Sequence, residues 1–233
     1  MEYDSNTIEK YAKKTDAHWQ GLYPAVIKSV GEYKDKKILD IGCGTGELSR
    51  YFSENGALVD AIDTSSSAIK FAKQQDNKTN YALADAQTLP FLDSSFDIAI
   101  MNMVLMHFEE YSTLEKAFSE ASRVLKKGGK LIFSDLHPIC KMTPKMLNRT
   151  MEYCDGFSYF KDESKYIARV KIGDESISFH NTHWTLPTLT KVAQNNGLSI
   201  AQIVEPENNI ESSSDIKFSY PEYILFVSKK VKE

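Results

Sequence analysis

Residues 38–48, which read I-L-D-I-G-C-G-T-G-E-L, decide the fold of this chain. The stretch begins as a short apolar run that contains one charged residue, Asp40, and continues with glycines at positions 42, 44 and 46. A helical pattern follows directly. A strand that ends in a glycine-rich turn and continues as a helix exposes backbone amides to a ligand, because glycine has no side chain in the way. The stretch therefore predicts a nucleotide-binding α/β turn.

Two acidic side chains distinguish this turn from one that binds a dinucleotide. The dinucleotide pattern G-x-G-x-x-G needs its last glycine where this chain has Glu47. The carboxylates of Asp40 and Glu47 would repel a pyrophosphate held at the helix N-terminus. The same charges favour a cationic ligand.

The run D-I-G-C-G-T-G, residues 40–46, resembles motif I of the class I (Rossmann-like) methyltransferases that use S-adenosylmethionine. The strings L-P-F-x-D-x-S-F-D at 89–97 and R-V-L-K-x-G-G-x-L at 123–131 are also similar to that family. A looser similarity, in the last third of the chain, is to a bacterial subgroup that methylates small molecules. The resemblance implies a doubly wound, seven-stranded, mainly parallel sheet with an antiparallel last strand and a lid or insertion after the fifth strand.

Repeating strand–helix units support the same α/β architecture. Hydrophobic patterns predict strands at 38–41, 58–62, 81–84, 98–101, 130–134, 198–204 and 223–227, and helices at 46–55, 114–127 and 187–196. We expect a single domain over residues 1–233. Its parts would be an N-terminal helical lid at 1–30, a cofactor-binding core at 36–135, a substrate-side insertion at 139–182, and the last helix and strands at 183–233.

The expected cofactor contacts lie where strands end, because ligands bind at the carboxyl ends of parallel strands. Asp63 lies 21 residues after Gly42, where a carboxylate can accept hydrogen bonds from both ribose hydroxyls; the alternative is a plain helix cap. The resemblance implies that Asp85 accepts from the adenine amino group, although it could be a solvated strand end. The full set of expected cofactor-binding residues is Tyr11, Asp40, Gly42, Cys43, Gly44, Asp63, Thr64, Asp85, Ala86, Asn102 and Met103.

The amino-acid composition limits the classes of partner that the protein could bind. The chain is 42% hydrophobic and 26% charged, and its formal charge of −4 argues against an electrostatic nucleic-acid binder. No run approaches the ~18 apolar residues of a membrane span. Three cysteines without a paired spacing favour a reduced cytoplasm. We expect a small-molecule acceptor as the partner, and a monomer or a homodimer.

The residues that would bind and activate the methyl acceptor are harder to predict from the sequence. Methyl transfer needs no fixed catalytic residue, but an acceptor that loses a proton needs a base, and histidine is the natural one. His137 and His183 flank the predicted ligand edge and are the candidate catalytic residues, with a structural role as the alternative for each. We expect His107, Tyr159 and Trp184 in the substrate pocket. We expect no metal site, because no Cys or carboxylate cluster accompanies the two histidines of H-N-T-H, residues 180–183.

The roles of the two flanking segments stay open. Aromatic residues of the N-terminal segment could close over the cofactor or simply pack its helices. Those of the insertion could form a wall for an acceptor or attach the insertion to the domain. The sequence predicts transfer of a methyl group from S-adenosylmethionine to N, O or C of a small molecule by in-line displacement, with S-adenosylhomocysteine as the other product. The alternatives are a quinone-biosynthesis type C-methyltransferase, a non-catalytic S-adenosylmethionine-binding protein and, less favoured, a tRNA methyltransferase.

Overall fold

The computed structural model describes residues 8, 12, 16–143, 149–172, 175–207 and 221–231. Tyr11, expected to contact the cofactor, lies outside the described residues.

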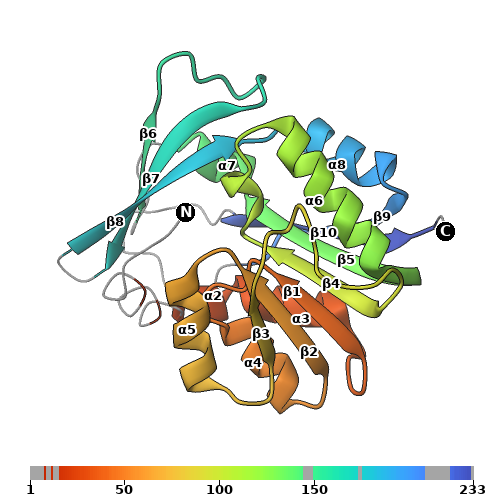
Figure 1. Ribbon diagram of the computed structural model, residues 1–233. Coiled ribbons are helices and arrows are strands. Elements are labelled where there is room, and N and C mark those ends of the chain that lie inside the picture. The colour runs from red at the N-terminus through yellow and green to blue at the C-terminus, as the bar shows by residue number, and fades with distance from the viewer. Residues whose placement is uncertain are drawn as a thin grey trace.

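A seven-stranded sheet in the order β3-β2-β1-β4-β5-β10-β9 forms the centre of the molecule (Figure 1). The strands from β3 to β5 are parallel to one another, and β10 runs antiparallel between β5 and β9. This is the predicted doubly wound sheet with its antiparallel last strand. The strands are β1 (Lys37–Ile41), β2 (Leu58–Asp63), β3 (Asn80–Leu83), β4 (Phe96–Asn102), β5 (Leu125–Leu136), β9 (Leu198–Val204) and β10 (Tyr223–Lys230).

Helices cover both faces of this sheet because alternate residues of its central strands are apolar on both sides. Leu39 of β1 and Phe133 of β5 pack on one face with α6 (Tyr111–Val124) and α8 (Leu186–Asn195). Ile38 and Ile132 pack on the other face with α3 (Leu22–Val30) and α4 (Glu47–Glu54). The remaining helices are α2 (Asp16–Gln20), α5 (Ser66–Gln75), the 3₁₀ turn η1 (Leu105–His107) and α7 (Pro138–Lys141).

The helix predicted over 114–127 starts and ends three residues earlier, at Tyr111 and Val124. Its predicted apolar stripe is buried, but Lys126 and Lys127 belong to β5 and not to the last helical turn. The chain leaves the helix because Leu125 already pairs with Phe96 of β4, and the Lys126 Nζ lies 2.7 Å from Asp97 Oδ1. Sheet pairing therefore overrides the local helical pattern.

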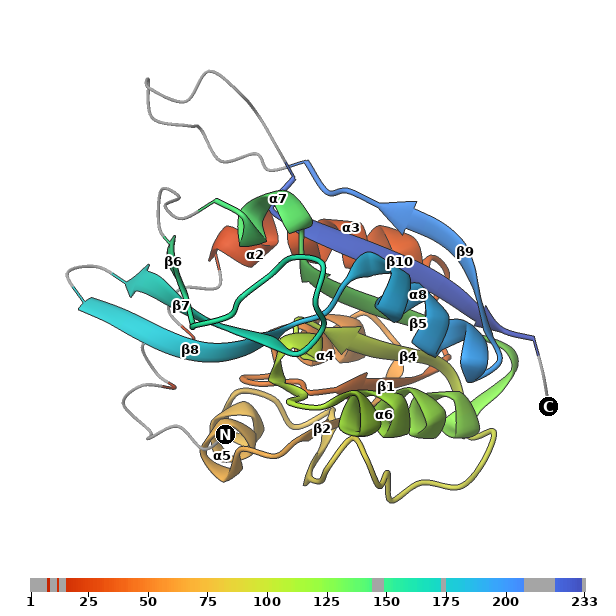
Figure 2. The same cartoon turned by 90° about the horizontal axis from the view of Figure 1, so that it is seen from above.

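The segment expected as an insertion contains regular structure. After α7 it forms a three-stranded antiparallel sheet of β6 (Arg149–Tyr153), β7 (Ser164–Ile172) and β8 (Glu175–His183), so that it extends one residue beyond the expected boundary at 182. Figures 1 and 2 both show this small sheet at one end of the molecule. Its inner face carries Tyr166 and Ala168, which are buried in the same core as α3 and α4.

Buried ion pairs hold α7 and the small sheet against the main sheet. The Lys141 ammonium lies 2.5 Å from Asp135 Oδ2, and both side chains are fully enclosed. Arg149 Nη1 of β6 lies 3.0 Å from Glu222 Oε1, beside the start of β10. Tyr153 donates a hydrogen bond to the Lys141 carbonyl oxygen at 2.9 Å. The position of the small sheet is therefore fixed by specific contacts with the strand ends of the main sheet.

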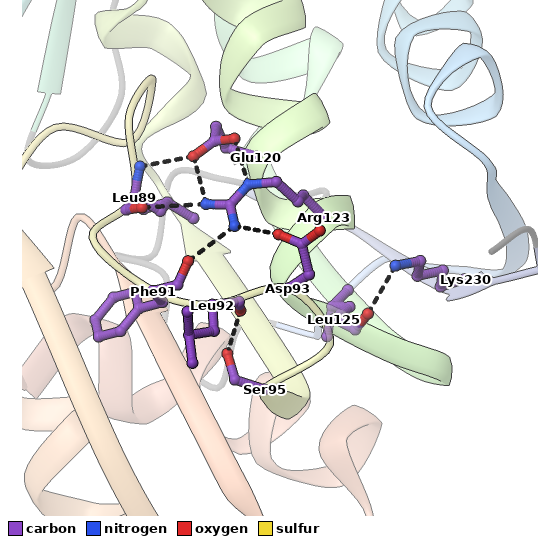
Figure 3. A network of polar contacts seen from close by, with 9 residues as sticks. All are labelled: Leu89, Phe91, Leu92, Asp93, Ser95, Glu120, Arg123, Leu125 and Lys230. Atoms are coloured by element: carbon purple, nitrogen blue, oxygen red, sulfur yellow. Dashed lines mark hydrogen bonds and ion pairs between the residues drawn. The ribbon is translucent and has the colours of Figure 1, made fainter.

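Arg123 of α6 holds the loop between β3 and β4 (Figure 3). Its guanidinium donates to the carbonyl oxygens of Leu89 at 3.1 Å and Phe91 at 2.8 Å. It also pairs with Asp93 and with Glu120, whose Oε2 accepts the Leu89 amide at 2.8 Å. This loop follows the strand end that carries Asp85, so the cluster supports one wall of the region in which a ligand is expected.

We predict that Arg123→Met lowers the free energy of unfolding by about 2 kcal/mol, because it leaves two carbonyl oxygens and two carboxylates without their donor. Urea denaturation measures the change. Arg169→Met is the matched control: that arginine pairs with Glu152 on an exposed surface, with 46% and 58% of the two side chains accessible, and its loss should cost less than about 1 kcal/mol. Equal losses for the two variants would contradict the bracing role of Arg123.

Candidate functional site

The glycine turn between β1 and α4 adopts left-handed backbone conformations. Gly42, Gly44 and Gly46 have φ values of 77°, 55° and 81°. A Cβ atom on Gly42 would lie 2.7 Å from Val104 Cγ2, and one on Gly46 would lie 2.5 Å from the Tyr81 hydroxyl oxygen. A Cβ on Gly44 would meet nothing within 4 Å. Two glycines thus allow close packing, and the middle one presents bare backbone to open space.

Asp63 at the end of β2 is held beside this turn. Its Oδ2 accepts the Gly44 amide at 2.9 Å, and its Oδ1 accepts the Ser65 amide at 2.8 Å. The neighbouring Ser65 is the N-cap of α5, since its hydroxyl accepts the Ala68 amide. A carboxylate offers about four acceptor positions, so each oxygen of Asp63 keeps a position for a ligand hydroxyl.

A cavity of about 350 Å³ opens at the carboxyl ends of β1, β2 and β4. Every predicted cofactor-binding residue that the structure describes lies on its wall. These residues are Asp40, Gly42, Cys43, Gly44, Asp63, Thr64, Asp85, Ala86, Asn102 and Met103. The structure thus brings the predicted residues together, and their part in binding remains a prediction.

The β4 end of the cavity is held by a short hydrogen-bond chain. The Ser134 hydroxyl donates to Asn102 Oδ1 at 2.8 Å and accepts the Met103 amide at 3.0 Å. Met103 has a φ of 56°, a conformation that costs a non-glycine residue about 1 kcal/mol or more. This left-handed conformation turns the chain at the edge of the cavity. The next residue, Val104, packs against Gly42.

Carboxylates dominate the charge around the glycine turn. Asp40 is only 3% exposed, and burial raises its pKa to about 7, against a hydrogen bond from Ser49 that lowers it. Burial also raises the pKa of Glu47, whose Oε1 accepts the Thr45 hydroxyl at 2.7 Å. No lysine or arginine lies among the described residues that line the cavity. These acidic hydrogen-bond acceptors therefore fit an adenosine with a cationic group and do not fit a pyrophosphate.

The raised pKa of Asp40 predicts a pH-dependent stability. A carboxyl group whose pKa rises from 3.8 to about 7 on folding stabilises the fold fully at low pH, and this contribution is lost as the pH rises through about 7. Relative to Asp40→Asn, the wild type should lose up to about 4 kcal/mol between acidic and mildly basic pH. Urea denaturation of both proteins at several pH values checks this, and parallel pH curves would contradict it.

The far end of the cavity is lined by residues that the sequence did not single out. They come from the N-terminal helices, the segment after η1 and the inner face of β8, and are Ile8, His18, Tyr23, Phe108, Ile177 and Phe179. The alternation of polar and apolar residues in S-I-S-F-H-N-T-H, residues 176–183, is the strand signal that would have pointed to Ile177 and Phe179. His107, expected in the substrate pocket, lies on the same wall with an exposed side chain.

The two candidate catalytic histidines do not line this cavity. His137 is the N-cap of α7: its Nδ1 accepts the Ile139 amide at 3.1 Å, and its Nε2 lies 2.8 Å from Glu205 Oε1. His183 is 1% exposed, and its Nε2 lies 2.8 Å from the Tyr159 carbonyl oxygen. These contacts are structural ones, and a catalytic role for either histidine stays a prediction.

Tyr159 and Trp184, expected in the substrate pocket, are not on the cavity wall either. Trp184 is 1% exposed in the core between the main sheet, α6 and α8, and its indole N–H donates to the Leu105 carbonyl oxygen at 3.0 Å. The Tyr159 ring packs against His183, with ring centroids 5.1 Å apart. Within the described ranges there is no group of three or more His, Cys, Asp or Glu side chains that could hold a metal ion, and no helix long and apolar enough to span a membrane.

Comparison with known proteins gives sequence relatives for the core of the chain. Residues 39–133 match a family model described as a methyltransferase domain. A malonyl-[acyl-carrier protein] O-methyltransferase from Pseudescherichia vulneris is 33% identical over 111 residues, which are 48% of this chain and 43% of that protein. A demethylmenaquinone methyltransferase from Renibacterium salmoninarum is 34% identical over 121 residues, 52% of this chain and 48% of that protein. The chain thus covers less than half the length of either relative.

Solved structures match over nearly the whole chain, at low sequence identity. An S-adenosylmethionine-dependent methyltransferase from Mesorhizobium loti has a TM-score of 0.64 and 21% identity, over 91% of this chain and 97% of that one. One from Methanosarcina mazei has a TM-score of 0.63 and 24% identity, over 91% and 99%. Residues 39–133 thus match a methyltransferase domain in sequence, and the sheet built around them has the class I, Rossmann-like fold of these structures.

Proposed function

We propose that the protein transfers a methyl group from S-adenosylmethionine to a small-molecule acceptor. The observation that carries this proposal is the cavity wall itself. A glycine turn with open backbone at Gly44 lies beside the strand-end carboxylate of Asp63, on an acidic wall without lysine or arginine among the described residues. The matched methyltransferase domain supports the same reaction class.

The carboxyl ends of neighbouring strands suit the parts of the cofactor in turn. Asp63 of β2 would accept from the ribose hydroxyls, and Asp85, which follows β3, would accept from the adenine amino group. Asn102 and Met103 at the end of β4 would contact the methionine part, close to the carboxyl group of Asp40. When bound, the cofactor supplies a methyl group activated by a sulfonium, so the protein has to align the acceptor and exclude water.

His107 is the histidine best placed to take a proton from the acceptor. It lies on the cavity wall three residues after Val104, and its amide bonds to the Val104 carbonyl oxygen at 3.0 Å. His18 also lines the cavity, but its ring packs against those of Tyr23 and Tyr223. Although the His107 side chain is exposed at the cavity wall, the protein packed around its imidazole partly desolvates the ring and lowers its pKa, so that the ring is neutral and able to accept a proton near pH 7.

We expect the protein to bind S-adenosylhomocysteine, and Asp63→Asn to weaken this binding by about tenfold to a hundredfold, because a charged acceptor of the ribose hydroxyls is lost. Isothermal titration calorimetry measures both. Asp60→Asn is the matched control, since Asp60 lies three residues earlier on β2 and is not on the cavity wall. Absence of binding to the wild-type protein would contradict the proposed function.

We expect the imidazole of His107 to titrate below the ordinary histidine pKa of 6.5, because desolvation disfavours its charged form. Histidine-selective NMR across a pH series measures this, and the resonance missing from His107→Gln identifies the residue. An imidazole that is still protonated at neutral pH would remove His107 as a proton acceptor.

A further inference from the structure

This inference rests on the proposed function and names the class of its acceptor. We propose that the acceptor is an uncharged, apolar ring compound with a single proton-bearing heteroatom, bound between η1 and the inner face of β8.

The two ends of the cavity differ in chemistry. The end at the glycine turn carries the carboxyl groups of Asp40, Glu47 and Asp63. At the far end, the described wall consists of apolar and aromatic side chains and two imidazoles, and contains no carboxylate, lysine or arginine. Aromatic and aliphatic walls favour flat apolar ligands, and a few polar groups among them fix the orientation. The imidazole of His107 is a hydrogen-bond acceptor that a hydroxyl or amine of such a ring could reach.

Phe179 and Ile177 pair with Ala168 and Val170 of β7, so the alternate residues Lys165, Arg169 and Lys171 lie on the opposite face of the small sheet from this wall. Lys165 donates to the Glu109 carbonyl oxygen and to the Thr182 hydroxyl. Arg169 pairs with Glu152 on the exposed face.

The two buried cations of this region are paired as well. Lys141 pairs with Asp135, and Arg149 with Glu222. A carboxylate at the far end of the cavity would therefore find no cation among the described side chains of the sheet. Burying it without a partner costs several kcal/mol. The malonyl group of the first relative carries such a carboxylate, whereas a quinone-type ring does not.

The far wall is fixed in place before any ligand arrives. Trp184, directly after β8, bonds to the Leu105 carbonyl oxygen of η1, and Glu163, directly before β7, accepts the Tyr111 amide at 2.8 Å. These contacts tie the hairpin of β7 and β8 to the segment that carries His107. A preformed wall loses little freedom on binding, which favours a rigid ring over a flexible chain.

Matched probes of one ring size test the proposal. With the protein saturated by S-adenosylhomocysteine near neutral pH, calorimetry compares neutral 2-naphthol, anionic 2-naphthoate and the cation of 2-naphthylmethylamine. We expect 2-naphthol to bind at least about tenfold more tightly than either ion. Equal or tighter binding of an ion, or no binding of 2-naphthol, would overturn the proposal while leaving the cofactor site intact. Failure of S-adenosylhomocysteine to bind would instead overturn the proposed function, and this inference with it.

Charge substitutions on β8 locate the ring. Phe179→Lys should reverse the order of the probes in favour of 2-naphthoate, because it puts a cation on the far wall. His180→Lys is the matched control: it adds the same charge at the next residue, which is exposed on the opposite face of β8, and should leave the order unchanged. Binding of S-adenosylhomocysteine to each variant verifies folding, and Ile177→Lys replaces Phe179→Lys if that variant fails this check. If the order of the probes is unchanged in Phe179→Lys, or in Ile177→Lys where that variant replaces it, the placement of the ring is overturned.

Discussion

The hydrogen bond from the Gly44 amide to the Asp63 carboxylate is the interaction on which the site depends. It joins the turn after β1 to the end of β2, and these two strands are parallel neighbours in the sheet. Their pairing register alone would not fix the position of the turn. The bond requires the left-handed backbone at Gly44, which a side chain there would oppose. Val104 against Gly42 and Tyr81 against Gly46 hold the turn from both sides. The cavity is thus shaped by backbone packing and by one oriented carboxylate.

The same cavity separates two tasks. Carboxyl groups at the glycine turn provide negative potential, which in a site with little water acts more strongly than it would at the surface. The far wall provides shape and an apolar surface, together with the imidazole of His107. This division follows from the topology, because the strand ends of the main sheet make one end of the cavity, while the small sheet and the N-terminal helices make the other.

The cofactor side could be predicted from the sequence because its signals are local. The glycine spacing and the acidic residue at the end of β2 each depend on a few consecutive residues. The far side could not, since Phe179 reaches the cavity only through pairing of β7 with β8 and docking of that sheet on the core. His137 was predicted from its proximity to the ligand edge, and its place directly before Pro138 is also an N-cap signal, which the structure bears out. In the helix predicted over 114–127, pairing between β4 and β5 decided the end that local periodicity had put at Lys127.

A crystal structure of the protein with S-adenosylhomocysteine tests the central claim most directly. The account predicts the ribose at the carboxylate of Asp63, the adenine beside Asp85, and the sulfur at the end of β4, facing His107 and Phe179 across the rest of the cavity. A ligand bound in the reverse direction, or away from the glycine turn, would contradict it.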